Sequence, residues 1–590
     1  MKHSLLSRLF CKRQTPVNPL EEEAMQGQLV TILKRLFSKP INTVAAAVFL
    51  LFLIGVLVGP LFRPLDVNYQ DMTQQNVSPG LNMLDVPAAL QGHVKQISVG
   101  STFSLGLSED GQVYAWGKTQ ITKKADIADI PENMGVVKLI AAGYDHAVAV
   151  NENNEVFCWG NNRLKQCDVP SKAKKANIVS VYAGYQYTAA ITDGGEVITW
   201  GNKSSVTASF KAAKGQYQKV VFTSSSALAL LSDGSVIYCG TDTSAEASVP
   251  EDLGTAVDIA CTGHTACAVL ADGTVRVWGV LEKGLGEVPA LSKKAVGVQS
   301  GRYHYTVLLE DGSCVSWGLN TYRQCNVPSK AEAVSLYAGY FQNYAVDENG
   351  YVTAWGLKGY PLGSDGYGRD VLARLLYGGR MTMTIGCVSV IISTIIGVIV
   401  GGVAGYFGGK TDMLLMRFEE IVASLPFLPF AMILSAIIGN KVSETGRILI
   451  IMVILGVLSW TGICRLVRAQ VLAEREKEYI LAGKAMGVKE WKLIIRHIIP
   501  NVISVVIVDM TLSFAACMLT ESGLSYLGFG VAEPRPTWGN MLSGCNDSVI
   551  IQNYWWRWVF PAVALGINTI AINVLGDGMR DAIDPKTEER

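Results

Sequence analysis

The chain has no excess of charge of either sign, because 50 Lys and Arg residues balance 50 Asp and Glu residues among 590. A nucleic-acid-binding protein needs a basic face that neutralises phosphates, and this balance indicates none. Nucleic acid is therefore not an expected partner. The average conceals a division, since residues 64–360 are polar whereas residues 381–577 consist mainly of long apolar runs.

Motifs for metal, nucleotide and catalytic chemistry are also missing. The 12 cysteines form no CxxC pair and no Cys/His spacing typical of zinc. The run Gly-Gly-Lys-Thr at 408–411 resembles part of a phosphate-binding loop, but that motif needs glycine where this chain has Ala404. His146, His264 and His304 have no evident nucleophile to activate. We expect no metal, no cofactor, no ATP site and no enzymatic activity.

Apolar stretches indicate a membrane protein. Residues 43–62 carry no charge and are long enough to cross a bilayer. Five more spans are expected near residues 383–406, 421–439, 447–464, 502–522 and 558–576. Pro426 and Pro429 are residues that can break the third of these six spans.

The basic residues predict an orientation. The loop between the fourth and fifth spans is rich in Lys and Arg, and seven basic residues precede the first span, among them Lys2, Arg8, Lys12 and Arg13. Cytoplasmic loops carry such an excess. We therefore expect the 465–501 loop and both termini to be cytoplasmic, and the polar region after the first span to lie outside the cytoplasm.

That polar region contains seven copies of one pattern. Each copy has a two-residue turn, such as Asp110-Gly111 or Asp311-Gly312, followed by a β-rich run that ends in Trp-Gly in six copies and in Cys239-Gly240 in the fourth. The turns recur every 38 to 43 residues. Asp, Asn and Gly favour tight hairpins, and a period near 40 with several short strands per copy is typical of propeller blades.

A Val-Pro or Ile-Pro phrase accompanies most copies and is expected on an edge strand. The pattern G-x-x-H … DG-x-V-x-x-WG, seen best at residues 143–146 and 301–304, resembles the repeats of the regulator of chromosome condensation family. The resemblance covers about residues 82–358 and implies a seven-bladed β-propeller whose two ends complete one blade together.

Cysteines in that region are permitted to form disulfides outside the cytoplasm. Most of them are expected to be packing residues within the repeats; examples are Cys158, Cys239 and the repeat-equivalent pair Cys167 and Cys325. Residues 261 and 267 form the best candidate bridge.

The remaining apolar part matches a second family. Its motifs are Gly368-Arg369-Asp370, Arg465-Leu466-Val467-Arg468, Leu524-Ser525-Tyr526-Leu527-Gly528-Phe529-Gly530, Thr537-Trp538-Gly539 and Leu575-Gly576-Asp577-Gly578-Met579-Arg580-Asp581-Ala582. Together they resemble the dipeptide, oligopeptide and nickel permeases of ABC importers, over about residues 30–66 and 360–585. The family consists of binding-protein-dependent transport inner-membrane components.

The resemblance also identifies a coupling loop. Its core in the family is Glu-Ala-Ala followed by Gly; here Leu481-Ala482-Gly483 and Gly487 stand in those places, so the first Glu and the second Ala are replaced. Glycine permits a sharp turn at 487. The predicted ATPase-coupling residues are Glu478, Tyr479, Ala482, Gly483 and Gly487. Charged residues near spans are candidates for function, and Asp509 and Glu521 are candidates for the translocation path.

We therefore predict an α-helical polytopic membrane protein of six spans with an inserted all-β seven-bladed propeller. The predicted divisions are 1–42, a cytoplasmic N-terminal segment; 43–62, the first span; 63–360, the extracytoplasmic propeller; and 361–590, a permease domain with five spans and the coupling loop 465–501.

The predicted function is the permease subunit of an importer for short peptides or a related small solute, in the plasma membrane of a prokaryote. The resemblance implies a homologous second permease subunit, two ABC ATPase subunits, an extracellular solute-binding protein and membrane lipid as partners. The alternative is a receptor or adhesion protein that reads an extracellular ligand on a permease scaffold.

Overall fold

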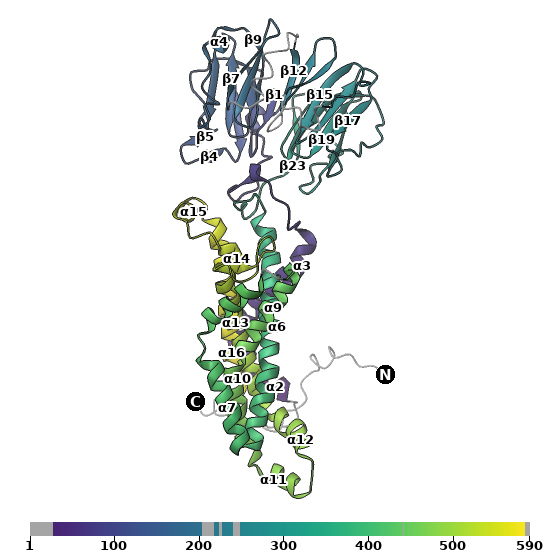
Figure 1. Cartoon of the computed structure of the whole chain (residues 1–590). Helices are drawn as coiled ribbons and strands as arrows, with labels where there is room; N and C mark the ends of the chain where they lie inside the picture. The colour runs from purple at the N-terminus through teal and green to yellow at the C-terminus, as the bar shows by residue number, and fades with distance from the viewer. Residues whose placement is uncertain (1–27, 203–216, 223–226, 240–247, 440–441, 584–590) are drawn as a thin grey trace, which may run out of the picture. The chain divides into compact units, whose positions relative to one another are not determined.

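The computed structural model describes residues 28–202, 217–222, 227–239, 248–439 and 442–583. Two compact units form, one from Met1–Tyr69 with Val371–Arg590 and the other from Gln70–Asp370 (Figure 1). The basic residues Lys2, Arg8, Lys12 and Arg13, and Gly240 of the fourth repeat, lie outside the described residues.

The first unit is helical. Its helices are α2 (Gln28–Ser38), α3 (Pro40–Phe62), α6 (Val371–Phe407), α7 (Gly409–Ser424), α8 (Phe427–Gly439), α9 (Glu444–Leu458), α10 (Trp460–Arg475), α11 (Glu478–Ala485), α12 (Glu490–Leu493), the π-helical turn η5 (Ile494–Ile498), α13 (Ile499–Tyr526), α14 (Trp538–Leu542), α15 (Ser548–Asn553) and α16 (Trp556–Ile583).

Five apolar stretches of the described chain are long enough to cross a membrane, and a bent pair makes up to six. The pair is α7 with α8, which meet at 81°. The bend lies at Leu425 and Pro426, between the end of α7 at Ser424 and the start of α8 at Phe427. Proline has no N–H to donate, and its ring clashes with the preceding helical turn, so a helix does not run through it undisturbed. Of the two prolines that the sequence analysis names, Pro426 therefore lies at the bend, whereas Pro429 lies within α8.

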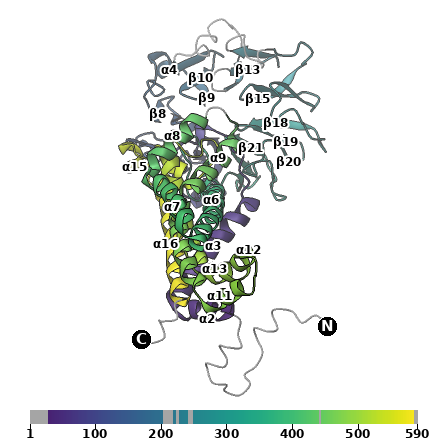
Figure 2. The same cartoon turned by 60° about the horizontal axis from the view of Figure 1, so that its bottom comes forward.

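Glycines on α6 set the distance between α6 and α10. A Cβ placed on Gly397 would lie 2.0 Å from Ile463, and one on Gly401 would lie 2.4 Å from the carbonyl oxygen of Cys464. Small residues let helix backbones approach closely in membranes. Helices α6, α13, α16 and α3 run side by side beside this contact (Figure 2).

The N-terminal end of α3 lies beside the C-terminal end of α16. Lys39 pairs with Asp581 at 2.7 Å, and a Cβ on Gly578 would meet the Asn42 side chain at 2.4 Å. Gly578 thus makes room for the start of α3.

The second unit consists of antiparallel sheets. Seven sheets have three described strands each: β1 (Val94–Val99), β2 (Phe103–Ser108) and β3 (Val113–Gly117); β6 (Val137–Ala142), β7 (His146–Asn151) and β8 (Val156–Gly160); β9 (Ile178–Ala183), β10 (Tyr187–Thr192) and β11 (Val197–Gly201); β12 (Tyr217–Phe222), β13 (Ala227–Leu231) and β14 (Val236–Cys239); β15 (Ala256–Thr262), β16 (Thr265–Leu270) and β17 (Val275–Gly279); β18 (Ala295–Ser300), β19 (His304–Leu309) and β20 (Cys314–Gly318); and β21 (Ser335–Gly339), β22 (Gln342–Val346) and β23 (Val352–Gly356).

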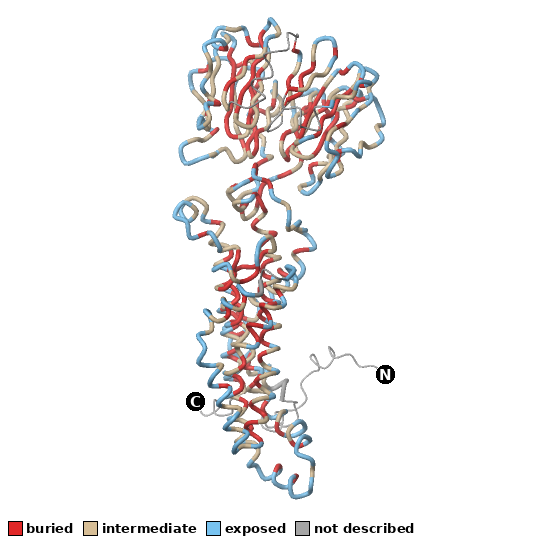
Figure 3. The backbone as a smooth tube through the Cα atoms, in the orientation of Figure 1, coloured by how far each residue is buried: buried red, intermediate tan, exposed pale blue. Residues whose placement is uncertain are grey.

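Smaller elements join the sheets. They are η2 (Met72–Gln74), η3 (Ala88–Leu90), the hairpin of β4 (Gln120–Thr122) and β5 (Ala125–Asp126), and α4 (Ser171–Lys175). The middle strand of each sheet is the most buried one, as the red segments of the β unit show (Figure 3).

The two-residue turns lie where the sequence predicts them, between the second and third strand of each sheet. Gly111, Gly234, Gly273 and Gly312 all have φ between 81° and 87°. Left-handed backbone favours glycine because it has no Cβ. The non-glycine turn residue Asn154 adopts φ 60°.

The first and last sheets pack against each other. The Trp116 indole N–H donates to the Tyr344 hydroxyl at 3.1 Å, and both side chains belong to one buried cluster with Leu90 and Ile97. Segment 84–92 reaches the last sheet as well, where the Val352 N–H donates to the Gln91 side chain at 2.8 Å. This contact brings the two ends of the repeat region together.

Repeat tryptophans tie a sheet to the chain that precedes it. The indole N–H of Trp159 donates to the Ile127 carbonyl, and that of Trp317 to the Leu285 carbonyl, both at 2.9 Å. The Val-Pro and Ile-Pro phrases differ from expectation: they are irregular segments and not edge strands. Their proline lacks the N–H that a fourth strand would need.

The bridge between residues 261 and 267 is wrong, since both cysteines are free. Cys261 is opposite Ala266, and Cys267 is opposite Ala260, on the antiparallel strands β15 and β16. Adjacent positions on a strand point to opposite faces, so the two thiols are directed apart.

The histidines of the repeat slot are structural. His146 and His304 are both fully buried, and each bonds through Nε2 to the next sheet, to Thr188 at 2.9 Å and to Asn343 at 3.0 Å. Burial lowers the pKa of His304 to about 4, although its hydrogen bond to Asn343 opposes the shift. The folded protein therefore holds this imidazole neutral.

We predict that acid destabilises the sheet of β18–β20. Below pH ~6.5 the unfolded chain takes up a proton that folded His304 refuses, so stability falls as the pH drops toward about 4 and then levels off. The full loss is about 3 kcal/mol. Hydrogen exchange of β18–β20 peptides measures it. His304→Gln is expected to flatten the pH dependence, whereas exposed His264→Gln is not; equal profiles for both variants would contradict the assignment.

Candidate functional site

The predicted coupling loop is a short helical hairpin between α10 and α13. Helix α11 begins three residues after α10 ends, and α12 with η5 leads into α13 without a break. Ile480 and Ile498 are fully buried in one cluster with Val471 and Val502. The hairpin is thus anchored on the two long helices that it joins.

Tyr479 fixes the start of α11. Its hydroxyl donates to Glu474 at 2.6 Å and accepts from the Asn501 amide at 2.8 Å. Glu474 also accepts from Lys477 at 2.5 Å. One phenol therefore links the end of α10, the start of α11 and the start of α13.

The two loop glycines have different roles. A Cβ on Gly483 would lie 2.7 Å from Leu493, so this buried glycine lets α12 pack on α11. Gly487 has φ 75° and open space around it, so the backbone turn is its only requirement. Glu478, Tyr479 and Ala482 are exposed. Four of the five predicted coupling residues are therefore accessible, and Gly483 positions the hairpin from inside.

The structure adds apolar residues to this surface that the sequence reasoning did not select. Met486 is 77% exposed and Trp491 is 57% exposed, and Leu481 and Ile495 lie exposed nearby in the sequence. Large exposed apolar side chains that cluster in a charged loop mark interaction sites. The sequence does contain a hint of this surface, because the apolar residues flank Gly487 on both sides. Only the folded hairpin, however, shows that their side chains are exposed.

The Arg465–Arg468 motif holds α10 to α7. Arg468 makes a bidentate pair with Asp412, at 2.5 and 2.6 Å. Arg465 lies 3.0 Å from Glu419, whose side chain is 2% exposed. Bidentate arginine–carboxylate pairs fix geometry as well as charge. Helix α7 of the bent pair is therefore attached to the helix that leads into the predicted coupling hairpin.

The Thr537-Trp538-Gly539 motif lies near the C-terminal end of α13, where a Cβ on Gly539 would meet Ser522 at 2.5 Å. Buried Trp538 donates its backbone N–H to Thr382 at 3.1 Å and its indole N–H to the Leu375 carbonyl at 2.9 Å. Gly379 makes room for the Trp538 ring. Arg374 is 1% exposed, and its Nη2 lies 3.0 and 3.1 Å from the two carboxylate oxygens of Glu533.

The two candidate path residues occupy different environments on α13. Glu521 is fully buried and accepts from the Ser525 hydroxyl at 2.6 Å, and it lies beside Thr382 of α6 and Thr537 at the start of α14. Asp509 is half-buried, and its described hydrogen bond is a long one of 3.4 Å from Ser513. Glu521 thus belongs to the junction of α6, α13 and α14, and Asp509 is the more accessible of the two.

Metal chemistry finds no support in the described part of the chain, where no group of three His, Cys, Asp or Glu residues is placed to hold an ion.

Known protein families match both the helical unit and the β unit. The profile of binding-protein-dependent transport system inner membrane components matches residues 394–589. The dipeptide transport system permease protein DppC of Bacillus subtilis is 41% identical over 227 residues, which are 38% of this chain and 68% of that protein. The oligopeptide transport system permease protein OppC of Haemophilus influenzae is 40% identical over 231 residues, 39% of this chain and 72% of that protein.

The chain belongs to this family of inner-membrane transport components. It is a transmembrane permease subunit with candidate spans in the α3–α16 unit. Its β unit carries regulator of chromosome condensation repeats, matched at 94–119, 137–166 and 295–324. The CRINKLY WD40 ectodomain of an Arabidopsis thaliana receptor kinase covers 45% of this chain and 98% of itself, at 20% identity and a TM-score of 0.37. At that TM-score the likeness supports no inference.

The Tyr479 link makes a testable contribution to the permease. We predict that Tyr479→Phe speeds hydrogen exchange in α11 about tenfold, because two hydrogen bonds at its hydroxyl are lost, at about 1 kcal/mol or more together. Exchange mass spectrometry of the detergent-solubilised permease measures this. The control is Tyr554→Phe, whose hydroxyl has no hydrogen bond among the described residues. Unchanged exchange in α11 would show that the link is not stabilising.

Proposed function

We propose that this permease is one subunit of an ABC importer for short peptides or a related small solute such as nickel. It works with a homologous second permease subunit, two ABC ATPase subunits and an extracellular solute-binding protein. The observation that carries the proposal is the exposed hairpin of α11 and α12. It combines the coupling motif with accessible Met486 and Trp491, and it is anchored on two long helices.

Mechanically, the hairpin is suited to transmit force. ABC subunits that close on ATP would move α11, and the Tyr479 link to Glu474 and Asn501 passes that movement to α10 and α13 at once. Arg468 and Asp412 extend the connection to α7. The bent α7–α8 segment therefore moves with the coupling hairpin.

The β unit is proposed to be a seven-bladed propeller outside the cytoplasm. Support comes from seven three-stranded sheets, from the direct packing of the first sheet on the last, and from the basic 465–501 loop on the opposite side of the predicted topology. The proposed divisions are 1–42, 43–62, 63–360 and 361–590, in the plasma membrane of a prokaryote with both termini cytoplasmic. The propeller then serves docking or recognition.

A direct test uses the exposed tryptophan of the hairpin. Trp491→Ala is expected to weaken ATPase binding about thirtyfold, and so to lower co-purification of the ATPase subunits and ATP hydrolysis, since truncating a central interface tryptophan costs about 2 kcal/mol or more. Gly487→Val is expected to do the same by straining the turn at φ 75°. The measurement is ATP hydrolysis by the complex in nanodiscs.

The matched control is Trp555→Ala, another exposed tryptophan, which lies between α15 and α16. It should leave ATPase binding intact. If no ATPase co-purifies with the wild-type chain, or if Gly487→Val leaves hydrolysis unchanged, the receptor alternative replaces the importer proposal.

A further inference from the structure

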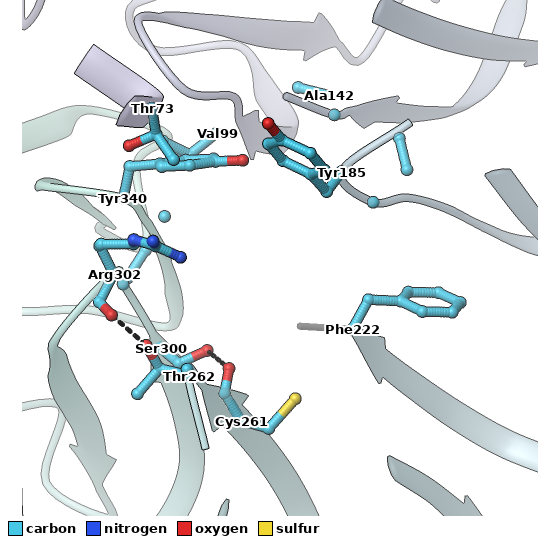
Figure 4. A pocket seen from close by; sticks show the side chains of 17 residues that line it. Thr73, Val99, Ala142, Tyr185, Phe222, Cys261, Thr262, Ser300, Arg302 and Tyr340 are labelled. Carbon is cyan, nitrogen blue, oxygen red and sulfur yellow. Dashed lines mark hydrogen bonds between the residues drawn. The ribbon is translucent and has the colours of Figure 1, made fainter. Parts of the chain in front are cut away.

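The β unit contains a pocket that neither family resemblance explains. Its volume is about 180 Å³, compared with the ~10–15 Å³ that a single water needs. Its wall comes from several different sheets and from η2, and includes Thr73, Tyr185, Thr262, Arg302 and Tyr340 (Figure 4). The pocket therefore has room for one small organic molecule.

One repeat position supplies most of the distinctive side chains. In the described copies a glycine ends or follows the first strand of the sheet, and the next residue varies. That next residue is Ser101, Tyr144, Tyr185, His264, Arg302 and Tyr340 in chain order. A repeat architecture places equivalent positions around one axis. The neighbouring histidine slot is buried and structural, whereas this slot changes from copy to copy.

Arg302 is the cation of this set, and it is held firmly. Its backbone N–H donates to the Tyr340 carbonyl at 2.6 Å, and its carbonyl accepts from Thr262. Its Nε lies 3.3 Å from Asp71, whose side chain is fully buried. Figure 4 shows the guanidinium group reaching into the pocket between Tyr340 and Thr262.

The contact with Asp71 involves only the Nε–H of the Arg302 guanidinium. The contact is long and involves Nε, and Oδ1 of Asp71 already accepts from the Thr73 backbone at 2.9 Å and the Thr73 hydroxyl at 2.6 Å. A guanidinium carries five N–H donors, and its fork matches a carboxylate. Asp71 is therefore a positioning residue that orients the Arg302 side chain through its Nε.

Tyrosines complete the pocket. Tyr185 and Tyr340 line it with their hydroxyl ends directed toward each other (Figure 4), and the Tyr185 ring packs on Tyr144 with centroids 4.6 Å apart. Burial raises the pKa of Tyr340 well above its usual value, so its phenol remains a neutral donor. One cation, phenol donors and aromatic faces together suit a carboxylate attached to an apolar or planar group.

We propose that this pocket binds the free C-terminal carboxylate of a short peptide, with Arg302 as its anion partner and Tyr185 and Tyr340 as hydroxyl donors. The choice of a peptide rests on the proposed function, because peptides with a free C-terminus are the solutes of that importer. The C-terminal residue is the part that the pocket accommodates, and its side chain lies against the tyrosine rings. The insertion is then a solute reader in addition to a docking surface.

The test is isothermal titration calorimetry on the full chain in detergent, with alanyl-phenylalanine and its C-terminal amide as probes. The acid is expected to bind at least about tenfold more tightly than the amide, because a charge-assisted hydrogen-bond pair is lost. Arg302→Gln should weaken binding of the acid by at least about tenfold. Arg276→Gln is the matched control, since Arg276 lies in the β unit as an exposed pair with Asp252.

Equal affinity of acid and amide for the wild-type chain overturns the proposal, as does an unchanged affinity in Arg302→Gln. Absence of binding to the wild type also overturns it. Should Arg302→Gln unfold the β unit, Tyr185→Phe and the comparison of acid with amide decide instead. ATP-driven uptake by the whole complex is scored separately: uptake without pocket binding rejects this inference alone, and pocket binding without uptake rejects the importer alone.

Discussion

The backbone hydrogen bonds between the segment that enters the β unit and the segment that leaves it are the constraint on which the rest depends. Gly80 donates to the Tyr360 carbonyl at 2.9 Å, Met83 to Lys358 at 3.0 Å, and Asn76 to Asp365 at 2.9 Å. A loop of a membrane protein can hold a large folded insertion only if both ends of the insertion meet. These pairs, with the packing of Trp116 on Tyr344, bring them together.

The same entering segment also contributes to the wall of the proposed binding pocket. It carries Asp71, which is fully buried beside Arg302, and Gln74, which donates to the Ser101 carbonyl at 2.7 Å. The wall of the pocket thus includes the chain that leads from the first predicted span. Within the β unit, a ligand in the proposed pocket would therefore contact the entering segment through Thr73.

Sequence patterns predicted the elements of both units well, because the patterns are local. Turn pairs such as Asp311-Gly312 require positive φ, and Pro426 forces a helix break, so each could be located without coordinates. What the sequence could not show is where side chains meet. The proposed bridge between residues 261 and 267 failed because adjacent strand positions direct the two thiols apart. The edge-strand role of the Val-Pro phrases failed because tryptophan side chains, and not a fourth strand, tie the sheets to their preceding segments.

At the candidate site, too, the sequence could not show which side chains are buried and which are exposed. Motif spacing selected the hairpin of α11 and α12 as the predicted coupling site and selected Gly483 as one of its residues, and the fold buries that glycine against Leu493. Exposure of Met486 and Trp491 depends on how α12 returns along α11, and no local pattern encodes it. Likewise, Glu521 and Asp509 look equivalent as acids on one apolar helix, and only packing separates buried Glu521 from half-buried Asp509.

The central claim is that this chain is the membrane-spanning part of an ATP-driven importer. The most direct measurement is uptake of a labelled short-peptide pool, and of nickel, into proteoliposomes that contain the chain with its second permease subunit, ATPase subunits and solute-binding protein. The account predicts accumulation that requires ATP and is lost with Trp491→Ala. Absence of ATP-dependent accumulation of every peptide and of nickel would contradict it.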